Sequence, residues 1–399
     1  MKPSAIILAF FTLGCWGLDR STENGEAAIT DPQVECSPYS YPLLVAQRVA
    51  FPTSWKPASI LQNDSDANAR WQSIASSVPN TQPKPAPGSS GASTFNYKAD
   101  DPDCWWTRSQ CTTPKLSGLP PDIANVPEPS TMGYGFDDGP NCSHNAFYDY
   151  LASKNQKATM FFVGSNVMDW PLEAQRALAD GHEICVHTWS HSPMTSLSSP
   201  SAFAELYYTV VGVTPTCWRP PYGDVDDRIR AIANGLGLRT ILWKYDSNDW
   251  RFNAGGVTKA QIDANYQSFI NQATTGTFSS AGAIILTHEL NNFTMQESMD
   301  YYDQLKSVFK YIVPVAVALN KTQPYVEKNY TLPTFEQCSG TTTVSPGSTS
   351  VSAEPSRSGG GPTQSEFPQN KKSSAATTIL TWSDAAKSVA ALISCLLLY

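Results

Sequence analysis

Short apolar runs alternate with amphipathic stretches between about residues 128 and 325, and this alternation constrains the fold more than any other feature. Runs such as ATMFFVG (158–164) and HEICVHT (182–188) have the length of buried strands, and WPLEAQRALADG (170–181) between them has helical spacing. Strands that alternate with helices form parallel βα units, so the sequence predicts a barrel-like or open parallel sheet. The same alternation includes TMGYGFD (131–137), HNAFYDYLASKN (144–155), RTILWKY (239–245), AQIDANYQSFINQATT (260–275) and AGAIILTHE (281–289).

Two groups of polar residues follow expected strands. Asp137 and Asp138 end one strand, where a solvated turn is the ordinary alternative. His187 and His191 follow another strand four residues apart, and on a helical turn both rings would point to one side, as a divalent metal requires. Packing or surface chance is the alternative for that pair. Because chemistry in parallel α/β folds lies at the carboxyl ends of strands, the four residues predict a metal site with a carboxylate ligand.

Five short motifs follow one another along the chain: GFDDG (135–139), HTWSH (187–191), RPPYG (219–223), DSNDW (246–250) and ILTHE (285–289). In this order they resemble the motifs of the NodB-homology polysaccharide deacetylases (carbohydrate esterase family 4), with the closest likeness to GPI-anchored fungal chitin deacetylases. The resemblance covers about residues 128–325 and implies a distorted (β/α) barrel with an incomplete strand count. It also implies hydrolysis of the N-acetyl groups of chitin, a polymer of N-acetylglucosamine, to chitosan and acetate in cell-wall remodelling.

The resemblance assigns a metal centre and a base. Asp138, His187 and His191 would bind a divalent metal, expected to be zinc with cobalt as an alternative. Asp137 would be the general base, because a metal activates water and a neighbouring unliganded carboxylate can remove its proton. Arg219 would hold Asp137 through a bidentate contact.

The remaining motifs supply the other implied roles. His288 would protonate the leaving amine, with Asp249 behind it to stabilise the imidazolium. The backbone N–H of Tyr222 would donate to the oxyanion. Leu286 and Trp250 would form the pocket for the acetyl methyl group, with plain core packing as the alternative for both.

The sequence departs from the family pattern at two places. Gly135 stands where the first motif usually begins with Thr, a position that supports packing. The segment between His191 and Arg219 is short for a full crossover helix, so the helix near Glu205 is expected to be clipped.

Both ends of the chain are typical of processing signals. Lys2 and the apolar run Ala5–Gly14 predict a signal peptide over 1–17, with a core helix as the alternative. Residues 340–373 form a Ser/Thr/Pro/Gly-rich stalk, expected to be disordered. Residues 374–399 have the small residues, spacer and terminal apolar run of a GPI-attachment signal, with Ser374 as the tentative attachment site and Ser373 or a neighbour as alternatives.

The rest of the chain completes the expected organisation. Residues 18–127 predict an irregular N-terminal extension, 128–325 the deacetylase domain and 326–339 a closing segment. The net charge of −8, without a basic block, argues against nucleic acid and suits chitin or its oligomers. The protein is expected to be a secreted monomer, attached through its anchor to the outer face of the plasma membrane or to the cell wall.

Cysteines and sequons fit a secretory compartment. Of nine cysteines, Cys15 and Cys395 lie in segments expected to be removed. The tentative disulfide pairs are Cys104–Cys111 and Cys142–Cys338. Cys185 and Cys217 are interpreted as buried thiols, with metal ligation or pairing as alternatives. Glycosylation sequons begin at Asn63, Asn141, Asn292, Asn320 and Asn329.

The sequence also leaves other functions open. A non-catalytic, wall-anchored carbohydrate-binding or structural protein would keep the stalk and anchor, but it would not need Asp137 and His288. A glycoside hydrolase would need its two carboxylates about 5–10 Å apart across a sugar, unlike two adjacent residues. Within the family, peptidoglycan or xylan could replace chitin as the substrate.

Overall fold

The computed structural model describes residues 19–92, 94–208, 212–252 and 256–339. The expected signal peptide, stalk and GPI-attachment signal, including Ser374, lie outside the described residues.

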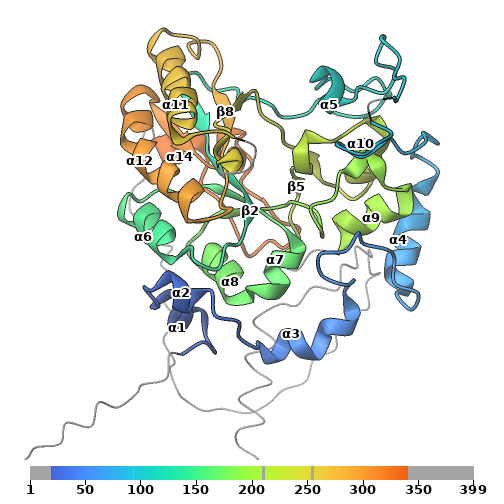
Figure 1. Cartoon of the computed structure of the whole chain (residues 1–399), viewed down its shortest axis with the longest axis horizontal. Helices are drawn as coiled ribbons and strands as arrows, with labels where there is room; N and C mark the ends of the chain where they lie inside the picture. The colour runs from blue at the N-terminus through green and yellow to red at the C-terminus, as the bar shows by residue number, and fades with distance from the viewer. Residues whose placement is uncertain (1–18, 93, 209–211, 253–255, 340–399) are drawn as a thin grey trace, which may run out of the picture.

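Parallel strands form the centre of the fold and helices surround them (Figure 1). One sheet has the order β7-β8-β1-β9 and the other the order β2-β3-β4-β5-β6, and every strand pairing is parallel. The predicted α/β class with parallel strands is confirmed. The strands are β1 (Thr131–Gly133), β2 (Gly135–Gly139), β3 (Thr159–Phe162), β4 (Glu183–Val186), β5 (Cys217–Trp218), β6 (Arg239–Thr240), β7 (Tyr245–Asp246), β8 (Ala283–Leu286) and β9 (Tyr311–Val313).

The run 131–137, expected as one strand, divides at Tyr134 into β1 and β2. β1 pairs with β8 and β9, whereas β2 pairs with β3. A parallel bridge between Asp137 and His288 continues β8 alongside β2 and so joins the two sheets. The two strand ends that carry these residues therefore lie next to each other.

Helices follow most of the strands. α11 begins with a capping box in which Thr258 and Gln261 bond each other's backbone N–H groups. The short segment after His191 does form a helix, α9, which is nine residues long. Apart from α3 of the extension, the helices of at least six residues are α4 (Ser65–Ala75), α6 (Asn145–Ser153), α7 (Gly164–Asp169), α8 (Pro171–Ala179), α9 (Ser199–Tyr207), α10 (Asp227–Gly235), α11 (Lys259–Thr274) and α12 (Asn292–Val308).

Short helices connect these elements or belong to the N-terminal extension. They are α1 (Glu23–Ala27), α2 (Pro32–Glu35), α3 (Pro42–Gln47), α5 (Trp106–Ser109), α13 (Val315–Ala318), α14 (Phe335–Ser339) and the 3₁₀ turns η1 (Arg48–Ala50), η2 (Met194–Ser196), η3 (Pro221–Gly223) and η4 (Asp249–Arg251).

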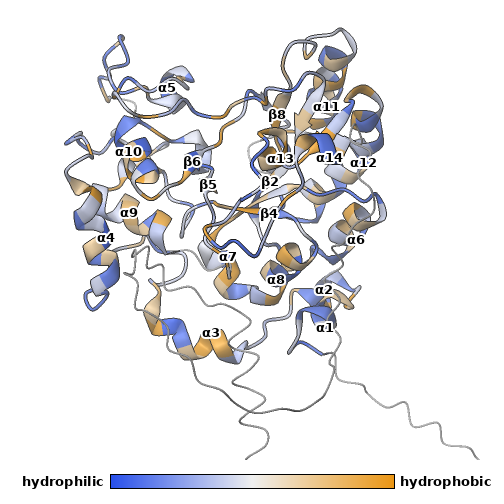
Figure 2. Ribbon diagram, turned by 180° about the vertical axis from the view of Figure 1, so that it is seen from behind, coloured by the Kyte–Doolittle hydropathy of each residue, from blue (hydrophilic) through white to orange (hydrophobic). Residues whose placement is uncertain are grey.

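The hydrophobic core lies between the strands and the helices. Hydrophobic residues run through the central ribbons near β4, and the outer helices show both polar and apolar residues (Figure 2). β3 and β4 are buried along their whole length. At Gly135 a Cβ atom would lie 2.8 Å from the carbonyl oxygen of Thr159, so glycine is the residue that fits there, as the packing interpretation expected.

Residues 19–127 are rich in loops and pack against the rest of the fold. The Asn145 side chain donates hydrogen bonds to the carbonyls of Glu26 and Ile29, and the Ala58 N–H donates to Glu205 Oε1. The extension is therefore part of the same packed structure.

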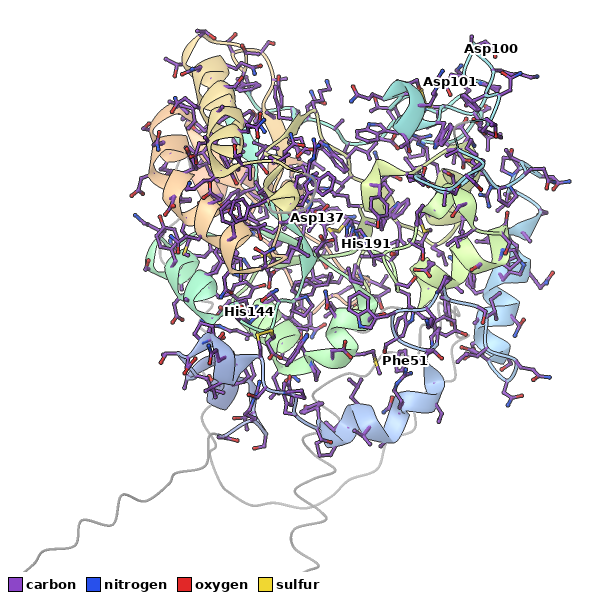
Figure 3. The ribbon with its side chains drawn as sticks, viewed as in Figure 1. Phe51, Asp100, Asp101, Asp137, His144 and His191 are labelled. Carbon is purple, nitrogen blue, oxygen red and sulfur yellow. A yellow bond between two sulfur atoms is a disulfide. The ribbon has the colours of Figure 1, made fainter. Side chains whose placement is uncertain are left out.

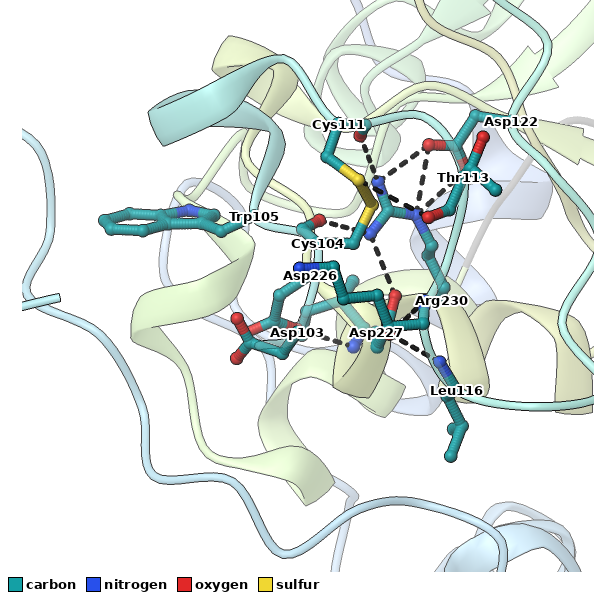
Figure 4. A network of polar contacts seen from close by, with 12 residues as sticks. Asp103, Cys104, Trp105, Cys111, Thr113, Leu116, Asp122, Asp226, Asp227 and Arg230 are labelled. Atoms are coloured by element: carbon teal, nitrogen blue, oxygen red, sulfur yellow. Dashed lines mark hydrogen bonds and ion pairs between the residues drawn. A yellow bond between two sulfur atoms is a disulfide. The ribbon is translucent and has the colours of Figure 1, made fainter. Parts of the chain in front are cut away.

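A buried polar network attaches the second half of the extension to α10 (Figure 4). Arg230 donates to the carboxylate of Asp122 and to the carbonyls of Cys104 and Cys111. Asp227 accepts the N–H groups of Lys115 and Leu116. Arg230 forms ion pairs with both Asp122 and Asp227, and all three side chains are buried. These contacts therefore hold the loop around α5 in one position.

The disulfides confirm one expectation and correct two others. Cys104 is bonded to Cys111, as expected. The Cys142–Cys338 pair is wrong: Cys142 is bonded to Cys36 of the extension, and Cys338 is a free, exposed thiol on α14. The reason is that the extension packs against the start of α6, beside Cys142.

Cys185 and Cys217 are also bonded to each other, so their interpretation as thiols is wrong. They lie on the neighbouring strands β4 and β5, and the pairing of Val186 with Trp218 places the two cysteines side by side.

No described helix combines the length and the apolar character needed to cross a membrane. Asn63, Asn292, Asn320 and Asn329 are at least partly exposed. Asn141 is half-buried, and its Nδ2 donates to the carbonyl of Leu290.

Candidate active site

A cavity of about 710 Å³ lies at the carboxyl ends of the central strands and gathers most of the residues that the motifs singled out. Figure 3 shows Asp137 and His191 close together near the middle of the molecule. The lining residues are Trp55, Trp106, Gln110, Asp137, Asp138, Asn166, His187, His191, Tyr222, Trp243, Lys244, Asp246, Trp250, Leu286, His288 and Leu290.

Asp137 and Asp138 both line this cavity although they are adjacent on β2. In a regular strand neighbouring side chains point to opposite faces. Here the pairing with β3 shifts between Asp137 and Gly139, and Asp138 has a left-handed backbone with φ 72°. The Asn166 side chain holds this turn by donating to the carbonyl of Asp138. The local irregularity lets two adjacent carboxylates face one cavity.

His187 and His191 lie on the loop that follows β4, not on a helical turn as the spacing had suggested. Thr188 and His191 have left-handed backbones, with φ 65° and 56°. The loop brings His187 Nε2 to 3.3 Å and His191 Nε2 to 3.1 Å from the same Oδ1 atom of Asp138. Both imidazoles therefore converge on one carboxylate oxygen.

The chemistry of these three side chains fits a divalent cation. His187 Nδ1 contacts the carbonyl of Arg219 at 2.8 Å, and since a carbonyl only accepts, Nδ1 carries the proton. In the neutral ring Nε2 is then an acceptor that faces another acceptor, Asp138 Oδ1. This oxygen is buried and has no hydrogen-bond partner among the described residues. A cation held by Asp138, His187 and His191 resolves this arrangement.

A second group with metal-ligand chemistry, Glu183, Cys185 and Cys217, does not form a comparable site. The two sulfur atoms are bonded to each other, so neither is available as a thiolate.

Asp137 is held by Arg219 through a single ion pair. Arg219 Nη1 lies 2.7 Å from Asp137 Oδ1, but Nε and Nη2 have no hydrogen-bond partner within the described parts of the chain. The expected bidentate contact is therefore wrong. The guanidinium instead stacks on Phe161, with Cζ 3.9 Å from the ring centre, and its side chain is fully buried. In this orientation Nη1 is the guanidinium nitrogen that reaches the Asp137 carboxylate.

His288 forms a close pair with Asp249. His288 Nδ1 donates to Asp249 Oδ1 at 2.6 Å, and the His288 backbone N–H donates to Asp249 Oδ2 at 3.0 Å. Burial alone lowers the pKa of His288, but the negative charges of Asp249, Asp138 and Asp137 together raise it to about 9. The ring is thus protonated at neutral pH.

The expected substrate-contacting residues also line the cavity. Leu286 is buried, and Trp250 and Tyr222 are exposed. Tyr222 has a left-handed backbone with φ 59°, and its hydroxyl lies 3.2 Å from His191 Nδ1.

Sequence reasoning missed several residues of the site. Trp55, Trp106 and Gln110 come from the extension, in which no motif indicated their position. Asp246 also lines the cavity, and its place at the start of the DSNDW motif was a signal that could have identified it.

Glu289 directly follows His288 and was also missed. It is fully buried and accepts from Asn141 N, His144 Nδ1 and Tyr148 Oη. Its backbone N–H donates to the carbonyl of Asp137. Glu289 thereby connects the turn after β2 to the segment that carries His288.

Comparison with known proteins defines the class. The polysaccharide deacetylase family matches residues 124–241. Chitin deacetylase 2 of Cryptococcus neoformans var. grubii serotype A is 52% identical over 341 residues, which are 82% of this chain and 75% of that protein. The chain therefore belongs to the polysaccharide deacetylase family.

Two further similar proteins are also named chitin deacetylases. The chitin deacetylase of Amylomyces rouxii is 42% identical over 74% of this chain and 73% of that protein. The structure of the chitin deacetylase of Colletotrichum lindemuthianum is 22% identical, covers 54% of this chain and 96% of that one, and superposes with a TM-score of 0.45.

Proposed function

We propose that the protein hydrolyses the N-acetyl groups of chitin, leaving glucosamine units and releasing acetate. The observation that carries this proposal is the meeting of three groups in one cavity. These are the Asp138, His187 and His191 donor set, the carboxylate of Asp137 beside it, and the His288–Asp249 pair. The names of the two relatives described above support chitin as the polymer.

In this proposal Asp138, His187 and His191 hold a divalent cation, with zinc preferred over cobalt. When bound, such a cation lowers the pKa of a water molecule and polarises the acetamide carbonyl.

Asp137 acts as the base. Its carboxylate takes a proton from the attacking water while the water oxygen forms a bond to the carbonyl carbon. Arg219 contributes by pairing with Asp137 Oδ1, which holds the carboxylate in one orientation.

His288 acts as the acid. Because Nδ1 is engaged by Asp249, Nε2 is the nitrogen left to give a proton to the departing amine as the C–N bond breaks. The products are acetate and a free amino group. Tyr222 N–H donates to the oxyanion, and Leu286 and Trp250 enclose the acetyl methyl group.

The test is acetate release from chitin oligomers before chelation, after chelation, and after zinc or cobalt is added back. We expect loss and recovery of activity. Full activity after exhaustive chelation, without metal by elemental analysis, would contradict the metal site. Acetate release from acetylated xylan or peptidoglycan but not from chitin would show that one of those polymers is the substrate. No release from any polymer would favour a non-catalytic binding protein.

We further propose that the protein is a secreted, glycosylated monomer attached outside the cell by a GPI anchor, with Ser374 as the attachment residue. The order of stalk, small residues, spacer and apolar end supports this location. Release from intact cells by a phosphatidylinositol-specific phospholipase is expected. Full-length protein free in the medium, with Tyr399 still present, would contradict the anchor.

A further inference from the structure

Large apolar side chains that remain exposed are concentrated around the active-site cavity. Among the described residues, eight large hydrophobic side chains are exposed, and four of them line this one cavity. They are Trp55, 49% exposed, Tyr222, 50%, Trp250, 41%, and Leu290, 39%. Exposed apolar groups that gather around a cavity mark a binding surface. Tyr222 and Trp250 belong to the family motifs, whereas Trp55 comes from the N-terminal extension.

Trp55 is fixed in place by contacts with α7. Its backbone N–H donates to Ser165 Oγ at 2.9 Å, and its indole Nε1 donates to Asp169 Oδ2 at 2.8 Å. With the only polar group of the side chain satisfied, the exposed part of the indole is purely aromatic. Such a surface suits an apolar ligand face rather than a hydrogen-bonding group.

The segment that carries Trp55 is docked on the loop of the two histidines. Phe51 stacks on Trp189 with ring centres 6.0 Å apart, and Trp189 Nε1 donates to the carbonyl of Thr53. Trp189 lies between His187 and His191 in the sequence and is fully buried. Figure 3 shows Phe51 on the side of the molecule below His191. The position of Trp55 is therefore tied to that of the proposed metal ligands.

The backbone of Trp55 is strained. Its φ of 60° is left-handed, which is unfavourable for a bulky residue and favourable for glycine. Bulky residues persist in such conformations where the surrounding structure holds them, often at ligand-binding sites. The turn thus keeps a large aromatic side chain where a smaller residue would fit the backbone better.

The strand order places Trp55 and Trp250 on opposite sides of the catalytic carboxylates. β7 pairs with β8, the continuation of β8 bridges Asp137 on β2, and β2 pairs with β3. Trp250 follows β7, whereas α7, which holds Trp55, follows β3. A linear polymer that crosses the cavity over Asp137 would meet one tryptophan on each side.

We propose that Trp55 is a sugar-binding platform, contributed by the N-terminal extension, that stacks against a pyranose ring of the same polysaccharide chain as the unit being deacetylated. The inference rests on the proposed function. A β-linked pyranose with equatorial substituents presents axial C–H groups on both faces, and these complement the apolar face of an indole. The extension then decides how strongly long substrates bind, whereas the catalytic groups act on any unit that reaches them.

The test compares Trp55→Gly and Trp55→Phe on the dimer and the hexamer of N-acetylglucosamine. Glycine removes the aromatic ring and also relieves the strained backbone, so the variant is expected to fold. We expect kcat/KM on the hexamer to fall about tenfold for Trp55→Gly, with the change mainly in KM and with little change on the dimer. Trp55→Phe keeps an aromatic face and should recover most of the loss.

Phe95→Ala is the matched control, because Phe95 is another exposed aromatic residue of the extension that does not line the cavity. It should leave both substrates unaffected. An equal loss on dimer and hexamer for Trp55→Gly, or no loss on either, would overturn the platform while leaving the deacetylase activity intact.

If the unmodified protein releases no acetate, the proposed function fails, and the platform is judged by hexamer binding in calorimetry. A Kd for Trp55→Gly about tenfold weaker than that of the unmodified protein would support the platform. An unchanged Kd would overturn it.

Discussion

The indole of Trp106 occupies the space in which a side chain on Gly223 would begin. A Cβ atom at position 223 would lie 2.1 Å from Trp106 Cζ3. Trp106 comes from the extension and contacts Trp243, with ring centres 4.8 Å apart, and Gly223 ends the RPPYG motif next to Tyr222. The extension therefore determines the shape of the loop that would supply the oxyanion donor.

Gly223→Ala should destabilise the protein by about 1–3 kcal/mol and lower kcat, because the new methyl group would displace Trp106 or the loop. Gly237→Ala is the matched control, since Gly237 also has a left-handed φ, 82°, but nothing lies within 4 Å of a Cβ there. Denaturant unfolding and acetate release measure the two effects. Equal behaviour of the two variants would show that backbone strain, not contact with Trp106, is the cause.

Asp137→Asn and Asp138→Asn should separate the base from the metal ligand. Asp137→Asn is expected to retain metal while losing most turnover, because only the proton acceptor is removed. Asp138→Asn is expected to lose metal, because both histidines converge on its Oδ1 atom. Elemental analysis after dialysis and acetate release provide the measurements. The same metal loss in both variants would show that the roles are assigned wrongly.

Asp249→Asn should move the alkaline limit of activity to lower pH. Burial lowers the pKa of His288, and Asp249 is the strongest of the charges that bring it to about 9. The acid must be protonated to act, so activity is lost as the pH rises through this pKa. Without the Asp249 charge the pKa falls, and the loss begins at a lower pH. A pH profile of kcat/KM checks the shift; an unmoved alkaline limb would mean that another group titrates there.

His182 should make the protein less stable in acid. Burial, followed by the positive charges of Lys157, His144 and Arg176, lowers the pKa of His182 to about 3, and its Nδ1 accepts the N–H of Ala158. Because the pKa of His182 is lower in the folded protein than in the unfolded chain, the neutral ring contributes its full stabilisation above about pH 6.5, the unfolded pKa. This stabilisation is lost as the pH falls toward 3.

Unfolding in denaturant at pH 7 and pH 4 provides the measurement. The native protein should lose roughly 3 kcal/mol more stability between these pH values than His182→Gln, which cannot titrate. All other titrating groups are common to both proteins and cancel. An identical loss of stability in both would contradict a neutral, buried His182.

The sequence alone determined the class of fold and the motif residues of the site. Alternating apolar runs and amphipathic stretches reflect local geometry, since the repeat of a strand or a helix is set by neighbouring residues. Motifs such as HTWSH and RPPYG follow strands, and parallel strands bring their carboxyl ends to one edge. For that reason the pattern was enough to predict that Asp137 and His187 share one site, and the resemblance of the motifs to the family added His288.

Only the tertiary structure decided how distant segments meet. The division of residues 131–137 between two sheets follows from which strands lie beside β1 and β2. The Cys36–Cys142 bond, the stacking of Phe51 on Trp189 and the position of Trp106 against Gly223 each join the extension to residues far away in the chain. Such contacts depend on the packing of the whole chain and have no periodicity in the sequence, so local patterns do not encode them.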